Sequence, residues 1–180
     1  MNIDLTNKSA LVCGSSQGIG KACAIELAQL GANVTLFARN QDSLEKILAV
    51  LDISKDQQHK ILIADFSKPE EVKSVINADV KKNDGYEILI NNTGGPAPGL
   101  ANVADAENFI DAFNLHLVSN HHLVQALLPY MKQQAYGRII NVISTSVKQP
   151  LPGLGVSNTI RGAVASWAKT LQNQSTWCNR

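Results

Sequence analysis

The segment ALVCGSSQGIG, residues Ala10–Gly20, joins an apolar run to a glycine-rich turn and the start of a helical pattern. A buried parallel strand needs a continuous apolar run, because neither of its faces meets water. Gly14 allows a sharp turn out of the strand, Gly18 a close approach of backbone to a ligand, and Gly20 close packing of helix on sheet. The segment therefore predicts a strand, a tight turn and a helix N-terminus whose free N–H groups suit a diphosphate.

The glycine spacing of this segment is G-x-x-x-G-x-G, which differs from the standard dinucleotide fingerprint G-x-G-x-x-G. Glycines also mark ordinary turns, so the spacing by itself is a weak signal. The apolar run before it and the helical pattern after it favour the nucleotide-binding interpretation.

The composition is that of a soluble globular protein. The chain has 180 residues with 44% hydrophobic and 17% charged side chains, so we expect one domain over 1–180. A net charge of +1 supplies no attraction for nucleic acid or membrane, and no apolar run approaches the length of a membrane span. The first five residues lack a signal-peptide pattern, and three scattered cysteines favour neither disulfides nor zinc. We expect a cytoplasmic protein.

Strand and helix patterns alternate along the chain. Further strands are expected at 33–37, 60–64, 87–90 and 138–143, and helices at 19–30, 44–51, 72–80 after a capping box at 67–70, 107–133 and 160–171. Alternation implies parallel pairing through long right-handed crossovers. The predicted fold is a doubly wound α/β sheet between two helical layers.

Ligands of such sheets bind at the carboxyl edge of the strands. Five chemistry-bearing residues follow directly after expected strands and so belong to that edge: Gly14, Arg39, Asp65, Asn91 and Ser144. Their convergence is the reason to interpret them as one site.

The chain resembles the short-chain dehydrogenase/reductase family, in particular its 3-oxoacyl-[acyl-carrier-protein] reductase branch. The motifs that carry the resemblance are 13–20, Asp65, 91–94, Asn114 and 138–144, and they span about residues 4–172. The resemblance implies a Rossmann-like fold, a nicotinamide cofactor, and hydride transfer between the cofactor and a small carbonyl or alcohol substrate. It also implies a homo-oligomer, because the last two helices of family members commonly form an intersubunit contact.

The resemblance implies a cofactor site in which the glycine turn meets the phosphates, Asp65 the adenine, and the segment 91–94 a ribose. The implied cofactor-binding residues are Gly14, Ser15, Ser16, Gln17, Gly18, Ile19, Gly20, Arg39, Asp65, Asn91, Thr93 and Gly94. Arg39 follows the second strand, where NAD-binding chains carry an acid, and no Asp or Glu occupies 37–40. An arginine suits a 2′-phosphate, so NADP is expected rather than NAD. Asp65 could also simply cap its turn.

The catalytic residues implied by the resemblance are Asn114 for a water relay, Ser144 for the substrate oxygen, and Ser157 and Arg161. The last two stand where the family has tyrosine and lysine. A phenol has a pKa of about 10 that a neighbouring ammonium can lower, whereas a serine hydroxyl is a far weaker acid and arginine stays protonated. We expect ordinary ketone reduction to be strongly impaired.

Family members run to roughly 250 residues, so the sixth and seventh strands have no counterpart here. The strand at 138–143 would then be an exposed apolar edge that favours self-association. The expected function is NADP-dependent hydride transfer, with a 3-oxoacyl thioester as one candidate substrate. The alternatives are an NADP-binding pseudoenzyme and a non-functional truncated fragment.

Three histidines on the expected long helix, His116, His121 and His122, raise the question of a metal site. Their spacing is not the i, i+4 pair of helical zinc sites, and no cysteine accompanies them. We expect solvated or partly buried histidines and no metal. Asn114 lies on the same helix, where a polar side chain can simply face solvent.

Overall fold

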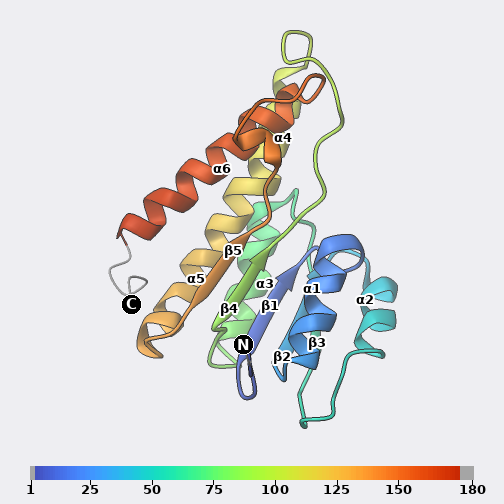
Figure 1. Ribbon diagram of the computed structural model, residues 1–180, viewed down its shortest axis with the longest axis vertical. Coiled ribbons are helices and arrows are strands. Elements are labelled where there is room, and N and C mark those ends of the chain that lie inside the picture. Colours follow the sequence, from blue (N-terminus) through green and yellow to red (C-terminus); the bar gives the residue numbers. More distant parts are fainter. Residues whose placement is uncertain (1–2, 175–180) are drawn as a thin grey trace.

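The computed structural model describes residues 3–174. Five parallel strands form one sheet in the order β3-β2-β1-β4-β5 (Figure 1). The strands are β1 (Ser9–Cys13), β2 (Asn33–Ala38), β3 (Lys60–Ile63), β4 (Ile88–Asn91) and β5 (Arg138–Asn141). Parallel neighbours need long crossovers, and helices occupy each of them. The doubly wound parallel α/β sheet expected from the sequence is confirmed.

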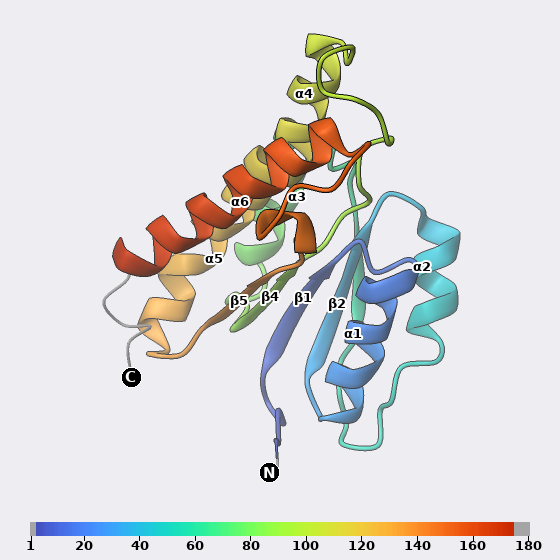
Figure 2. The ribbon, with the colours of Figure 1, turned by 45° about the horizontal axis from the view of Figure 1, so that its top comes forward.

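Helices cover both faces of the sheet (Figures 1 and 2). They are α1 (Gly18–Gln29), α2 (Gln41–Leu48), α3 (Pro69–Val80), α4 (Ala106–Phe113), α5 (Ser119–Gln133) and α6 (Gly155–Gln174). Successive strand residues point to opposite faces, so β1 contributes to both sides. Ala10 and Val12 pack with α1 and α2, whereas Leu11 and Cys13 pack with α3 and α5. The core therefore has two halves, one on each side of the sheet.

Helix α1 packs on the sheet through small residues. Gly20, Ala24 and Ala28 are its buried positions, which lets its backbone approach the strands closely. Ile19, in the first turn of α1, is 58% exposed and lies at the carboxyl edge of the sheet, where it lines the cleft described below. Because glycine and alanine contribute little to a hydrophobic pattern, the sequence does not identify Gly20, Ala24 and Ala28 as the buried face of α1.

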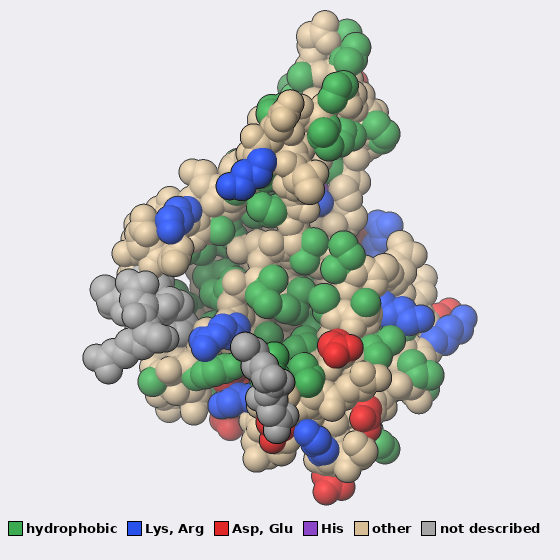
Figure 3. Space-filling model, viewed as in Figure 1, with side chains coloured by type: hydrophobic (Ala, Val, Ile, Leu, Met, Phe, Trp, Pro, Cys, Tyr) green, Lys and Arg blue, Asp and Glu red, His purple; other side chains and the backbone are tan. Residues whose placement is uncertain are grey.

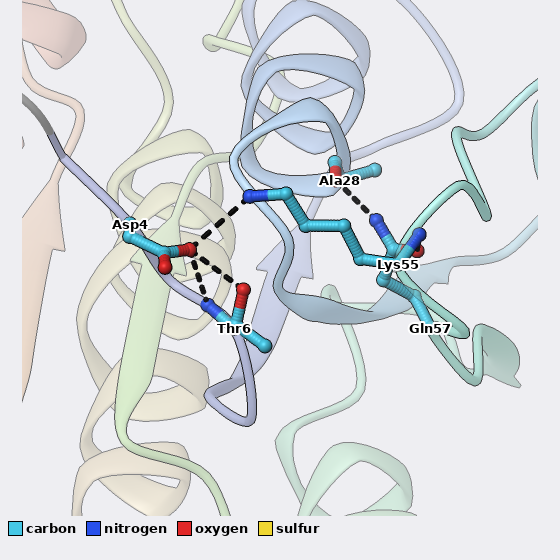
Figure 4. A network of polar contacts seen from close by, with 5 residues as sticks. All are labelled: Asp4, Thr6, Ala28, Lys55 and Gln57. Carbon is cyan, nitrogen blue, oxygen red and sulfur yellow. Dashed lines mark hydrogen bonds and ion pairs between the residues drawn. The ribbon is translucent and has the colours of Figure 1, made fainter.

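The segment before β1 is held at the amino ends of the strands (Figure 4). The Asp4 carboxylate accepts hydrogen bonds from the Thr6 hydroxyl at 2.6 Å, the Thr6 backbone N–H at 3.1 Å and the Lys55 ammonium at 3.2 Å. The Thr6 bonds, followed by Lys55, lower the pKa of Asp4 to about 2. Beside them, the Gln57 amide donates to the Ala28 carbonyl at 2.7 Å. These contacts tie the loop before β3 to the segment before β1 and to the end of α1. They lie at the end of the sheet opposite the candidate site.

One local expectation is wrong. The capping box expected at Ser67 and Glu70 does not form: Lys68 is the N-cap of α3, and the Ser67 hydroxyl donates to Asp65 instead. Pro69 does occupy the first turn, where its missing N–H costs no hydrogen bond.

The helix expected at 107–133 consists of three parts. A π-helical turn, Asn114–Val118, separates α4 from α5. Such turns are rare and occur mostly at functional positions within helices. Here the turn includes Asn114 and His116, so it shifts the register of both relative to a regular helix.

The outer edge of β5 pairs with no strand within residues 3–174. A groove of about 410 Å³ lies between β5, α5 and α6. Its walls include Ile139, Ile143 and Leu171, and Figure 3 shows apolar side chains gathered in this hollow. Ile140, on the other face of the strand, is 52% exposed. Within the same residues, no helix has the length and apolar character needed to cross a bilayer.

Candidate functional site

A cleft of about 440 Å³ opens at the carboxyl ends of β1, β2, β3 and β4. It brings together segments that are far apart in the sequence. Its lining residues are Gly14, Ser16, Gln17, Gly18, Ile19, Ala38, Arg39, Ala64, Asp65, Phe66, Asn92, Thr93, Gly94, Gly95 and Leu115. Nine of the residues proposed for cofactor binding therefore share one cleft, at the edge where doubly wound sheets bind ligands.

The glycine turn after β1 is held by Asn92. Gly14 has φ +58°, and its N–H donates to the Phe37 carbonyl at 2.8 Å. The Asn92 side-chain amide donates to the carbonyls of Cys13 and Gly14 at 3.4 and 3.3 Å. A Cβ on Gly14 would lie under 3.0 Å from the backbone of Asn92. The turn and the loop after β4 therefore fit together only with glycine at this position.

The N-terminus of α1 is open toward the cleft. Its N-cap, Gln17, makes no side-chain hydrogen bond, and the first turn contains no acid. The N–H groups of this turn are thus free to bind an anion, with the helix dipole adding attraction. A Cβ added to Gly18 or Gly94 would meet no protein atom within 4 Å, so both glycines leave space in the cleft. These features fit a dinucleotide.

Two residues of opposite charge, Arg39 and Asp65, line the cleft. Burial raises the pKa of Asp65, but hydrogen bonds from Ser67 and the charges of Arg39 and Lys68 outweigh it, so the pKa is lowered. Asp65 accepts from the Ser67 N–H at 3.0 Å and hydroxyl at 2.8 Å. Asp65 thus forms the capped turn that its residue type allows, and it lines the cleft as well.

Three of the proposed cofactor residues do not line the cleft. Ser15 is fully buried, and its hydroxyl oxygen accepts from the Phe37 N–H at 2.9 Å. The Asn91 amide donates to the Asn141 side chain at 2.9 Å, linking β4 to β5. Gly20 lies behind the turn, against Gly14. These three residues therefore stabilise the strands and the turn that surround the cleft, and they do not line it.

The four proposed catalytic residues lie outside this cleft. Asn114 begins the π-helical turn, and the Ser144 hydroxyl accepts from the Ser146 N–H at 3.1 Å. Ser157 is half-buried in the first turn of α6, and Arg161 follows one helical turn later on the same side. The Arg161 guanidinium donates to the Val142 carbonyl at 3.0 Å.

His116 is a buried residue that the sequence did not assign to the site. It is 1% exposed, and its Nδ1 lies 2.6 Å from the hydroxyl of Thr93, a cleft residue. Burial, together with the charge of Arg161, lowers the pKa of His116 to about 3, so the ring is neutral near pH 7. Among residues 3–174 no group of three His, Cys, Asp or Glu could hold a metal ion. The π-helical turn, which has no signal in hydrophobic periodicity, places this histidine beside Thr93.

Comparisons with known proteins support the architecture. A family model described as short chain dehydrogenase matches residues 8–177. Hydroxysteroid dehydrogenase-like protein 1 of Gallus gallus is 34% identical over 147 residues, or 81% of this chain and 44% of that protein. Inactive hydroxysteroid dehydrogenase-like protein 1 of Homo sapiens is 30% identical over 165 residues, or 91% of this chain and 50% of that protein. The chain thus spans about half the length of these curated relatives.

A solved structure gives a similar result. L-sorbose reductase from Gluconobacter frateurii, complexed with NADPH and L-sorbose, superposes with a TM-score of 0.90 at 29% identity. The similarity covers 97% of this chain and 66% of that reductase.

Proposed function

Because the chain belongs to the short-chain dehydrogenase family, we propose that it is an oxidoreductase that binds NADP(H) in the cleft at the carboxyl edge of the sheet. The observation that supports this most is the uncapped N-terminus of α1 opening into that cleft. NADPH in the similar L-sorbose reductase supports the choice of dinucleotide. The cofactor would supply a hydride for a carbonyl substrate or accept one from an alcohol.

In this proposal the backbone N–H groups at the start of α1 bind the diphosphate, and Gly18 and Gly94 provide room for it. Arg39 binds the 2′-phosphate with its guanidinium fork, and Asp65 lies beside the adenine. Asn92 keeps the turn rigid from behind. Ser144 would then hydrogen-bond the substrate oxygen, and Asn114 would support a water.

The NADP preference can be tested at Arg39. Arg39→Ala is expected to weaken NADPH binding about 10- to 100-fold, because a hydrogen bond to a charged group contributes about 1.5–3 kcal/mol. NADH binding should change little, since NADH lacks the 2′-phosphate. Fluorescence titration with both cofactors measures this. Lys68→Ala is the matched control: Lys68 is an exposed cation near Asp65 that does not line the cleft. Equal weakening of NADPH and NADH binding in Arg39→Ala would refute the 2′-phosphate role.

A second candidate function is an NADP-binding protein without turnover. It is favoured by Ser157 and Arg161 in place of the family's tyrosine and lysine, and by the human relative named inactive. A 3-oxoacyl thioester remains a candidate substrate for the active form. NADPH binding without reduction of an acetoacetyl thioester would support this second candidate, and absence of NADPH binding would support a non-functional fragment.

We also propose self-association through the outer edge of β5. This edge pairs with no strand among residues 3–174 and carries exposed apolar side chains, so it is a template for pairing with another copy. Ile140→Lys on this edge should shift the chain toward monomer in size-exclusion chromatography with light scattering. Val50→Lys is the control, because Val50 is 63% exposed but lies after α2, away from the edge. A monomer at every concentration tested would contradict this proposal.

A further inference from the structure

The π-helical turn at Asn114–Val118 forms part of the cleft, because its Leu115 is one of the lining residues. An i→i+5 turn inserts one residue into the i→i+4 ladder of a helix, so one carbonyl nearby loses its regular donor. Buried backbone carbonyls need hydrogen-bond partners. The turn is therefore stabilised by a donor from a side chain.

Asn120 supplies such a donor. Its side-chain amide donates to the His116 carbonyl at 2.7 Å, and the residue is only 5% exposed. The Asn120 Oδ1 is buried and has no hydrogen-bond partner within residues 3–174. A leucine would fill this place without burying an unpaired oxygen, so packing alone does not require an asparagine. The bond to the turn is what the asparagine contributes.

The turn and the residue after it contact two loops of the cleft. His116 Nδ1 lies 2.6 Å from the hydroxyl of Thr93, in the loop after β4. Ser119 follows the turn directly, and its hydroxyl donates to the Phe66 carbonyl at 2.7 Å, in the loop after β3. His116 and Ser119 are both buried, and Thr93 and Phe66 both line the cleft. One turn of helix therefore holds both loops.

The distance between these two loops has no other obvious determinant in the sheet. In the strand order, β3 and β4 are separated by β2 and β1, so no ladder joins them directly. The loops that follow β3 and β4 therefore meet the cleft from two sides. Because the π-helical turn contacts both, its shape sets their separation.

We propose that Asn120 is a positioning residue for the dinucleotide. It holds the π-helical turn, and the turn keeps the loops after β3 and β4 at the separation that the cofactor needs. Asn120 does not line the cleft, so it acts through His116 and Ser119. The inference rests on the proposed binding of NADP(H) in the cleft and adds a residue that controls it.

The test is a double-mutant cycle in the 180-residue protein. Asn120→Leu is expected to weaken NADPH binding about 2- to 10-fold in fluorescence titration, in line with the loss of one hydrogen bond. Thr93→Val breaks the same link at its other end, leaves the helix unchanged, and should weaken binding by a similar factor. In the double variant the two losses should not add, because both substitutions remove one chain of contacts.

Asn83→Leu is the matched control. The Asn83 amide also donates to the carbonyl four residues earlier, that of Asp79, at 3.2 Å. It lies just before β4, at the end of the sheet opposite the cleft. This variant should lower the melting temperature and leave NADPH affinity unchanged.

The position of the loops is also measured without cofactor, by two-dimensional ¹H–¹⁵N NMR. Asn120→Leu should shift the amide signals of Phe66 and Thr93, and Asn83→Leu should not. Unshifted signals in Asn120→Leu would overturn the proposal, and so would additive losses in the cycle. If Asn120→Leu does not fold, unchanged NADPH affinity in Thr93→Val still overturns it. Absence of NADPH binding by the unsubstituted protein would refute the proposed function, while the NMR signals would still show whether Asn120 positions the loops.

Discussion

Ser157→Tyr combined with Arg161→Lys is expected to raise NADPH-dependent reduction of an acetoacetyl thioester by about 10²–10⁴-fold, the usual contribution of general acid catalysis. Both positions lie on α6, four residues apart and so on one side of the helix. A phenol there can protonate the developing alkoxide, and an ammonium lowers its pKa toward neutrality. An acetoacetyl thioester is the appropriate substrate, because a 3-oxoacyl thioester is the candidate substrate named for the active enzyme.

The control is Ser157→Phe with Arg161→Lys, which adds the ring without the hydroxyl. The rate of reduction by the unsubstituted protein and by both double variants is measured as the steady-state loss of NADPH absorbance. If the Phe variant matches the Tyr variant, the gain comes from packing and not from proton transfer. If the unsubstituted protein already reduces the thioester rapidly, the interpretation of Ser157 as a poor proton donor is wrong.

Gly20→Ala is expected to lower the free energy of unfolding by about 1–3 kcal/mol, as overpacked sites do. A Cβ at this position would lie under 3.0 Å from the carbonyl carbon and oxygen of Gly14 and from the Asn92 amide. Backbone atoms cannot move aside as a flexible side chain does. The turn whose N–H groups are proposed to bind the cofactor would shift, so NADPH affinity should fall as well. Thermal melting with and without NADPH measures both effects.

Gly162→Ala is the matched control. It is also a helical glycine, on α6, but an added Cβ would meet no atom within 4 Å. Because alanine is the better helix former, this variant should be up to about 1 kcal/mol more stable than the unsubstituted protein. Equal behaviour of the two glycine variants would show that close packing behind the turn is not what requires Gly20.

The sequence was sufficient to predict the sheet and the first crossover, because these depend on local patterns. The apolar run before Gly14 indicates a buried strand, and the glycines of the turn indicate a sharp bend, without knowledge of the rest of the chain. The alternation of strands and helices then restricts the topology to parallel pairing. The carboxyl edge follows from that, and Arg39 and Asp65 line the cleft there.

Properties that depend on tertiary contacts could not be predicted. The Ser15 hydroxyl points inward to Phe37, although its neighbours in the motif line the cleft. Asn92 was predicted only as part of the segment 91–94 that meets a ribose, and its bonds to the turn after β1 involve residues nearly half the chain away. The capping box at Ser67 failed because the Asp65 carboxylate competes for the same hydroxyl.

The position of β1 between β2 and β4 has a consequence for how the chain folds. Ala10 pairs with Val34 on one side and with Ile88 on the other. The first ladder can form while synthesis is still in progress, whereas the second must wait until β4 has been made. Non-local parallel ladders close slowly, since loop entropy is lost before contacts compensate for it. During that interval the side of β1 that will pair with β4 is an open strand edge, which favours misassembly.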